Sequence, residues 1–380
     1  MSPRQPVAIL AKQASLEITS FSMPISIARS VAFDTLHAVE AGGYASDLLL
    51  AHTASLESRD AGLASAIVFG VLRYRAQLDC LIARISGRSG KLDIEVRTAL
   101  RMGIYQLRYL ERVPAHAAVT ESVNLVKRAR KTSAAGFVNA VLRKVDRDPV
   151  EWPSREIAWS CPEWLLARWE RNFGAAAAEG IARAALETPE NYVQVDTGRT
   201  QDVGSQAIVP LLDLHPGQWF LDLCAAPGNK TAQALATVPG IRAVACDLHF
   251  HRLQPLRSLG VPLVQVDGTK PTPFGRRFDR ILVDAPCSGT GTLGRNPEIK
   301  WRLTPSDIAD LAARQRALLS NALDLLAPGG RLVYSTCSLE PEENWDIVSQ
   351  IGQGRAERAL ERLPGRDPGD GFWAAVIKSD

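Results

Sequence analysis

The fold of the second half of the chain is decided by Leu221–Thr231, which reads LDLCAAPGNKT. An apolar strand at 219–223 enters a turn of small residues that contains Gly228, and a helix is expected from Thr231. Small residues let the backbone approach a ligand, and a helix start offers unpaired N–H groups to a carboxylate. The turn matches neither GxGxxG nor GxxxxGK[ST], which disfavours dinucleotide and nucleoside triphosphate sites. Taken alone, an ordinary strand-to-helix turn explains it equally well.

Strands and helices alternate after this turn. We expect further strands at 241–246, 263–266, 280–283 and 331–334, and a long helix at 305–326. This alternation predicts an α/β domain with a Rossmann-like parallel sheet, whose ligands bind at the carboxyl ends of the strands.

Three successive strands run into an acid: Asp247, Asp267 and Asp284. Asp247 follows the turn by about 20 residues, where a carboxylate can accept both ribose hydroxyls. Asp267 could accept an adenine amino proton. A site with one lysine, Lys230, and no glycine-rich phosphate cradle suits a nucleoside that carries an amino acid, so we predict S-adenosylmethionine as the cofactor. A single such Asp is more often a helix cap, but three at equivalent places favour a site.

The first part of the chain shows a different spacing of apolar residues. Apolar residues recur at helical spacing from residue 25 to about 143, as in Ala32, Leu36 and Val39, which predicts a small all-α domain. A length of 380 residues suggests two or three domains. Between the two main parts we expect a helical stretch at 162–186 and a short strand at 192–195. The expected divisions are a tail (1–24), an all-α domain (25–147), a connecting subdomain (148–205) and an α/β domain (206–380).

The net charge of +3 divides unevenly along the chain. Residues 1–150 carry 20 Lys and Arg against 13 Asp and Glu, whereas residues 151–380 carry 24 against 28. The basic part is expected to meet a polyanion, and the cluster 127–131 (KRARK) could follow phosphates, although a solvated helix end explains such a cluster equally well.

Composition excludes several classes of protein. The chain is 46% hydrophobic and 22% charged, and no apolar run approaches the roughly 18 residues of a membrane span. Without a signal-peptide pattern, a cytoplasmic location with no membrane partner is expected. Six cysteines without a CxxC pair predict neither a disulfide framework nor a zinc site, so no metal is expected.

Two cysteines stand at strand ends. Cys287 follows the strand that ends at Asp284, and Cys337 follows the next strand, in the sequences DAPCSG and STCS. Thiols at neighbouring strand ends, beside an acid, suggest nucleophilic catalysis by a thiolate. The remaining cysteines are expected to be small buried apolar residues or, for Cys224, part of the turn: Cys80, Cys161, Cys224 and Cys246.

With these residues in view, the chain resembles the RNA cytosine-5 methyltransferases. The carrying motifs are LDLCAAPGNKT, VDAPCSGTGTLGRNPEIKW and YSTCSLEPEEN. The segments VFGVLRY, RMGIYQLRYL, RVPAHAAVTESV and FVNAVLRKV look like the NusB-like RNA-binding domain of the subfamily that acts on bacterial 16S ribosomal RNA, the Sun or Fmu type. The resemblance covers about residues 25–378.

The resemblance implies roles for individual residues. Cys337 would be the nucleophile, Cys287 would assist product release, and Asp284 would lie against the cytosine ring edge and the methionine end of the cofactor. In the DNA cytosine-5 methyltransferases the cysteine of the Pro-Cys motif is the nucleophile instead. The matching cofactor positions are Cys224, Ala225, Ala226, Pro227, Gly228, Asn229, Lys230, Asp247, Asp267 and Asp284.

The chain also departs from the family pattern. Asn229 stands where the family usually has Gly, and Asn is the next-best residue if that position needs a positive φ. The segments 267–279 and 337–371 are short, so the late strands of the sheet are expected to be abbreviated.

The expected partner is RNA, 16S ribosomal RNA by resemblance, bound by a monomer. Arg295, Asn296 and Lys300 follow the Pro-Cys loop and could reach a phosphate or the flipped nucleotide. A tRNA cytosine-5 methyltransferase is the nearest alternative, and a non-catalytic RNA-binding assembly factor is another. The intact Cys287 and Cys337 argue against the latter.

Overall fold

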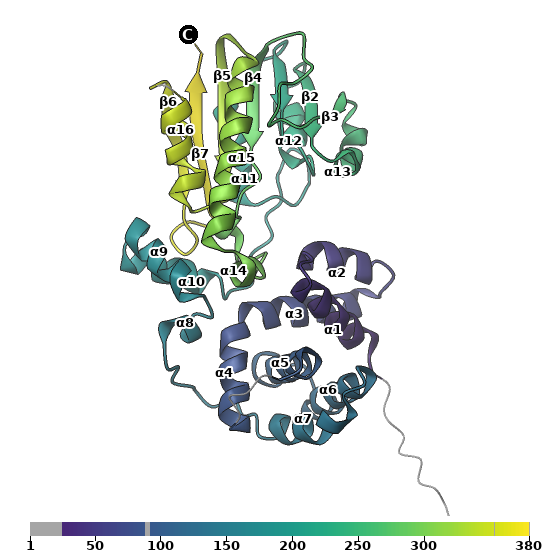
Figure 1. Ribbon diagram of the computed structural model, residues 1–380. Coiled ribbons are helices and arrows are strands. Elements are labelled where there is room, and N and C mark those ends of the chain that lie inside the picture. Colours follow the sequence, from purple (N-terminus) through teal and green to yellow (C-terminus); the bar gives the residue numbers. More distant parts are fainter. Residues whose placement is uncertain (1–24, 88–91, 353, 380) are drawn as a thin grey trace, which may run out of the picture.

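The computed structural model describes residues 25–87, 92–352 and 354–379, which form an all-α part followed by an α/β part (Figure 1). This confirms the predicted fold class. The predicted tail, residues 1–24, lies outside the described residues. No helix of the described ranges has the length and apolar character that crossing a bilayer requires.

The all-α part is built around one central helix. In α5 (Ile94–Tyr109) almost every residue from Val96 to Gln106 is buried, as expected of a helix surrounded by others (Figure 1). The core that it shares with its neighbours contains Ala32, Leu36 and Ile67, three of the residues that show the helical spacing. The surrounding helices are α1 (Ile27–Glu40), α2 (Ala45–Thr53), α3 (Ser58–Arg73), α4 (Arg75–Ser86), α6 (Ala115–Arg128) and α7 (Ala135–Leu142).

The connecting region differs from the sequence prediction in two ways. The stretch expected as one helix is two, because Gly174, with φ of +85°, separates α9 (Glu163–Phe173) from α10 (Ala175–Ala184). The strand expected at 192–195 is wrong: Val193 makes one isolated bridge to Thr200 within a turn. No neighbouring strand supplies a ladder there. The short helices of this region are α8 (Arg155–Ala158) and α11 (Val203–Gln206).

The α/β part contains a seven-stranded sheet in the order β3-β2-β1-β4-β5-β7-β6 (Figure 1). Neighbours among β1 to β5 pair in parallel, and β7 runs antiparallel to both β5 and β6. The strands are β1 (Trp219–Asp222), β2 (Arg242–Asp247), β3 (Leu263–Gln265), β4 (Phe278–Asp284), β5 (Leu326–Thr336), β6 (Ala356–Arg362) and β7 (Phe372–Lys378). The helices are α12 (Asn229–Thr237), α13 (Phe250–Leu253), α14 (Ile299–Arg302), α15 (Pro305–Asp324) and α16 (Trp345–Ile351).

The expectation of abbreviated late strands is wrong. Strands β6 and β7 have seven residues each, and β7 pairs with β5 along Arg331–Thr336. Antiparallel neighbours need only a short connection, so the shortening of the chain falls on loops. Strand β5 also begins five residues before the predicted 331, because Leu326 already pairs with Phe278 ahead of a register shift.

Two glycines of α3 provide a matched test of packing in the all-α part. A Cβ on Gly70 would lie 1.9 Å from Cζ of Tyr105, whereas a Cβ on Gly62 would meet nothing within 4 Å. We expect Gly70→Ala to lower the free energy of unfolding by about 1–3 kcal/mol or more. Gly62→Ala should raise it by about 0.5–1 kcal/mol, because alanine is the better helix former. Urea unfolding measures both; equal effects would contradict this packing.

Candidate active site

Four acids line the carboxyl edge of the sheet. Asp222, Asp247 and Asp284 end β1, β2 and β4, and Asp267 follows β3 by two residues. Because these strands are adjacent and parallel, the structure brings the three predicted acids to one edge. Asp222 was not predicted as a site residue, although it stands at the same strand-end position inside the LDLCAAPGNKT motif.

Asp222 is held in an unusual environment. Its side chain is buried, Thr231 Oγ1 donates to its Oδ2 at 2.6 Å, and its Oδ1 makes no hydrogen bond of normal geometry to the described residues. Burial raises the pKa of this carboxyl to about 7, and the bond from Thr231 opposes that rise. The buried oxygen is therefore an acceptor that a cationic ligand group could satisfy.

The turn between β1 and α12 does not need a positive φ at position 229. The positive φ, +103°, belongs to Gly228, whereas Asn229 is the first residue of α12 and is not among the residues with positive φ. A Cβ on Gly228 would lie 2.5 Å from Leu256 Cγ, so glycine is required there on steric grounds as well. The Asn229 amide instead donates to Thr200 O at 3.3 Å, which ties the turn to the connecting region.

These residues fit S-adenosylmethionine. The start of α12 offers N–H groups without intrahelical acceptors to a carboxylate. Asp247 accepts one bond, from the His249 N–H at 2.9 Å, and its other oxygen lies 3.7 Å from Arg252, so it can accept further bonds from hydroxyls. Bonds from Thr269 lower the pKa of Asp267, which remains an ionised acceptor at the sheet edge.

Lys230 and Asp284 form an ion pair at this edge. Lys230 Nζ donates to Asp284 Oδ2 at 2.6 Å, and Ser335 Oγ donates to the other carboxylate oxygen at 2.8 Å. The ammonium also lies 5.6 Å from the centre of the Phe372 ring. Both carboxylate oxygens are thus occupied, which fixes the orientation of Asp284 at the end of β4.

The two predicted catalytic thiols lie together. Cys287 Sγ and Cys337 Sγ are 3.4 Å apart, within hydrogen-bonding range for sulfur, and both cysteines are partly accessible. The hydrogen bond with Cys337, together with burial, raises the pKa of Cys287 well above its usual range. The separation suits an S–H···S hydrogen bond in which either thiol could be the donor.

The other cysteines lack this character. Cys161 and Cys246 are fully buried, and burial raises the pKa of each to about 12. Burial also raises the pKa of Cys80 and, well above its usual range, that of Cys224. Their assignment as packing and turn residues is consistent with this environment.

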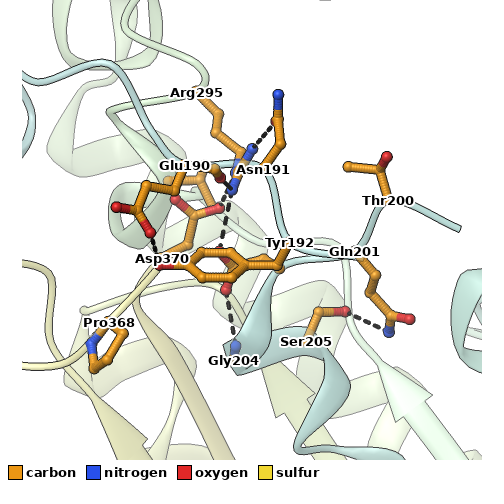
Figure 2. A network of polar contacts seen from close by, with 12 residues as sticks. Glu190, Asn191, Tyr192, Thr200, Gln201, Gly204, Ser205, Arg295, Pro368 and Asp370 are labelled. Atoms are coloured by element: carbon orange, nitrogen blue, oxygen red, sulfur yellow. Dashed lines mark hydrogen bonds and ion pairs between the residues drawn. The ribbon is translucent and has the colours of Figure 1, made fainter. Parts of the chain in front are cut away.

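Arg295, predicted to reach RNA, is instead engaged within the protein. Its Nε donates to Asp370 at 2.6 Å, and its Nη2 contacts Asp202 at 3.2 Å and donates to Glu190 O at 2.7 Å (Figure 2). Burial raises the pKa of Asp370 to about 6. This network joins the Pro-Cys loop, the connecting region and the loop before β7, so Arg295 holds the loops around Cys337 together.

Lys300 corrects the RNA prediction outright. It is fully buried, and its Nζ donates to Arg73 O at 3.0 Å, so it cannot reach a phosphate. The Trp301 indole donates to Leu72 O at 2.7 Å. Two side chains of α14 thereby satisfy carbonyls at the end of α3, which joins the all-α part to the loop that follows Cys287. Asn296, the third residue predicted to contact RNA, accepts from Ser46 Oγ at 3.4 Å at the same junction.

The basic cluster is partly neutralised. Arg128 pairs with Asp34 at 2.5 Å, and Lys131 pairs with Asp93 at 2.8 Å. Lys127 and Arg130 are exposed and form no ion pair with any residue that the structure describes. A phosphate contact, if made by this cluster, therefore falls to these two.

A cavity of about 400 Å³ lies beside the loop that follows Cys287. Its walls come from the end of α10, from Thr290 to Gly294 and from the loop before β7, and it contains neither catalytic thiol. Its charged lining is mainly acidic, with Glu187, Glu190, Asp367 and Asp370 against Arg366, so it does not suit a phosphate.

The strand order and the acids at the strand ends define a Rossmann-like methyltransferase, here preceded by an all-α domain. Residues 209–377 match the family described as 16S rRNA methyltransferase RsmB/F, and residues 26–147 match the NusB family. The chain belongs to the RsmB/F family and is an S-adenosylmethionine-dependent RNA methyltransferase.

Similar proteins span nearly the whole chain. Ribosomal RNA small subunit methyltransferase B of Erwinia tasmaniensis is 32% identical, with 92% of this chain and 98% of that protein covered. The protein of that name from Klebsiella pneumoniae is also 32% identical, over 92% of this chain and 97% of its own length. Among solved structures, PH0851 has a TM-score of 0.76 at 20% identity, with 94% of this chain and 100% of that chain covered, which is a likeness of fold.

The ribose-binding role of Asp247 can be tested by binding alone. We expect Asp247→Ala to weaken S-adenosylmethionine binding by about tenfold or more, because hydrogen bonds to a charged acceptor are worth about 1.5–3 kcal/mol. The exposed Asp310 on α15 provides a control with the same charge change, and Asp310→Ala should bind normally. Titration calorimetry measures both, and equal affinities for the two variants would rule out the assignment.

Proposed function

We propose that this enzyme methylates carbon 5 of a cytosine in 16S ribosomal RNA through a covalent bond between Cys337 and the base. The observation that carries the proposal is the 3.4 Å separation of the Cys287 and Cys337 sulfurs at the sheet edge that also bears the cofactor acids. Relatives named ribosomal RNA small subunit methyltransferase B support the substrate.

The cofactor would be held by groups on three strand ends. Asp247 would accept the ribose hydroxyls, Asp267 would face the adenine, and the start of α12 would bind the carboxylate. The buried Asp222 would accept from the amino group of the methionine moiety. When bound, S-adenosylmethionine supplies an electrophilic methyl group. The other backbone positions that would line this site are Cys224, Ala225, Ala226, Pro227, Gly228 and Asn229.

The residues of the chain then prepare the base. The Cys337 thiolate adds to carbon 6, forming a sulfur–carbon bond and moving electron density to carbon 5, which is otherwise a poor nucleophile. After carbon 5 is methylated, a base, here water, must accept its proton. The electrons of that C–H bond restore the ring double bond, and the sulfur–carbon bond breaks with its electron pair on Cys337.

Cys287 would act in the first and the last step of this reaction. Once Cys337 is a thiolate, the S–H of Cys287, whose sulfur lies 3.4 Å away, would donate to it and stabilise it before attack. The same side chain lies next to the adduct when the product is released. Asp284, fixed by Lys230 and Ser335, would bind the ring edge of the cytosine.

The NusB-like domain is proposed to bind RNA, with boundaries at 25–147, a connecting subdomain at 148–205 and the methyltransferase domain at 206–380. Lys127 and Arg130 are the cluster residues left for phosphates. We expect the enzyme to be a monomer and to act in the cytoplasm.

Bisulfite sequencing of total RNA from a deletion strain tests the substrate. We expect one cytosine of 16S ribosomal RNA to lose its 5-methyl mark, with restoration by the wild-type gene. Loss of a tRNA mark instead would support a tRNA methyltransferase. If no mark is lost, a non-catalytic assembly factor becomes the better account.

Cysteine variants test the assigned roles. Cys337→Ala should abolish both methyl transfer and covalent RNA adducts, because it removes the attacking sulfur. Cys287→Ala should accumulate a denaturation-resistant protein–RNA adduct, because product release is impaired. Cys80→Ala, in the all-α domain, should behave as the wild type on the same denaturing gels. An adduct formed by Cys337→Ala would show that the roles are reversed.

A further inference from the structure

One carboxylate connects the two loops that carry the thiols. Glu343 lies in the short helical turn Pro341–Glu343 after β5, and its side chain is fully buried. Its Oε1 accepts from the backbone N–H of Ser288 at 2.8 Å, and its Oε2 accepts from the hydroxyls of Ser288 and Ser338. Ser288 directly follows Cys287, and Ser338 directly follows Cys337.

The position of this carboxylate is itself fixed from several sides. Gln315 Nε2, from α15, donates to Oε1 at 3.0 Å and to Pro286 O at 2.8 Å. The Tyr334 hydroxyl, from β5, donates to the backbone carbonyl of Glu343 at 2.8 Å. Glu343 is therefore hydrogen-bonded to β5 and α15, and through Ser288 and Ser338 it also holds both cysteine loops in place.

The proposed reaction requires a fixed distance between the two thiols. Two sulfurs 3.4 Å apart must keep that separation while one attacks carbon 6 and the other stays within reach of the adduct. A displacement of about 1 Å can cost about 100-fold in rate. Burial raises the pKa of Glu343, whereas the bonds from Ser288 and Ser338 lower it, so these donors favour the carboxylate.

We propose that Glu343 is a positioning residue for both thiols: by bonding to the residue that follows each cysteine, it sets the separation of Cys287 and Cys337. This inference rests on the proposed function of the two thiols. Glu343 touches neither substrate nor cofactor in this account, and it acts through Ser288 and Ser338.

Glu343→Gln, in the full-length enzyme, tests the proposal. We expect kcat for RNA methylation to fall about 100-fold while KM for RNA and for S-adenosylmethionine stays within about twofold, because binding surfaces are untouched. The adjacent Glu342→Gln is the matched control: Glu342 pairs with Arg168 outside this network, and its kcat should equal that of the wild type. Equal kcat values for the two variants would overturn the proposal.

A second measurement reads the thiol separation without RNA. The oxidant diamide should join Cys287 to Cys337 in the wild type: each thiol loses one proton and one electron, the sulfur–sulfur bond forms, and diamide is reduced to its hydrazine. Mass spectrometry of peptides follows the rate, which should be several-fold slower in Glu343→Gln. An unchanged rate would overturn the proposal. A wild type that fails to methylate RNA would overturn the proposed function alone.

Should Glu343→Gln fail to fold, the two serines provide the test. Ser288→Ala and Ser338→Ala should each lower kcat, and the double variant should lose little more than the worse single one, because the two hydroxyls bond to the same carboxylate and lie 3.0 Å from each other. Multiplicative losses would show that the serines act independently and would overturn the proposal.

Discussion

The loop that follows Cys287 depends on one buried ammonium group, that of Lys300, which contacts the all-α domain and not RNA. Lys300 is wholly removed from water, and burial lowers its pKa to about 8, yet it bonds to a carbonyl at the end of α3. Removing a charge from water is costly unless a partner is supplied, so this contact requires the NusB-like domain to stay docked. The loop after Cys287 is thus anchored to the other domain.

The position of the proposed active site is set by the strand order of the sheet. Adjacent parallel strands deliver Asp222, Asp247, Asp267 and Asp284 to one edge, and the next strand delivers the Thr-Cys loop to the same edge. In the proposed function, the methyl donor and the target base would therefore bind at neighbouring strand ends. The ion pair of Lys230 with Asp284 lies between the two, so the cofactor turn and the thiol loops share a charged contact.

The sequence predicted most of this arrangement. The positions of β1 to β5, the acids at the ends of these strands and the placement of the two cysteines at neighbouring strand ends could be predicted, because they depend on local periodicity and on short motifs. The prediction for Lys300 went wrong because a basic residue after a catalytic loop looks the same in sequence whether it binds phosphate or a buried acceptor. The sequence alone did not show whether position 229 needs a positive φ; the structure assigns the positive φ to Gly228.

By itself, then, the sequence determined the fold class and the family, and it predicted the acids and the two thiols of the proposed site, because each of these is encoded within a few consecutive residues. Only the tertiary structure decided what Lys300, Arg295 and Glu343 do. Lys300 and Arg295 bond to residues 227 and 75 positions away along the chain, and Glu343 joins Ser288, 55 positions away, to Ser338, five positions away. Whether a charged side chain meets water or a buried acceptor depends on how distant segments pack, and no local pattern contains that information.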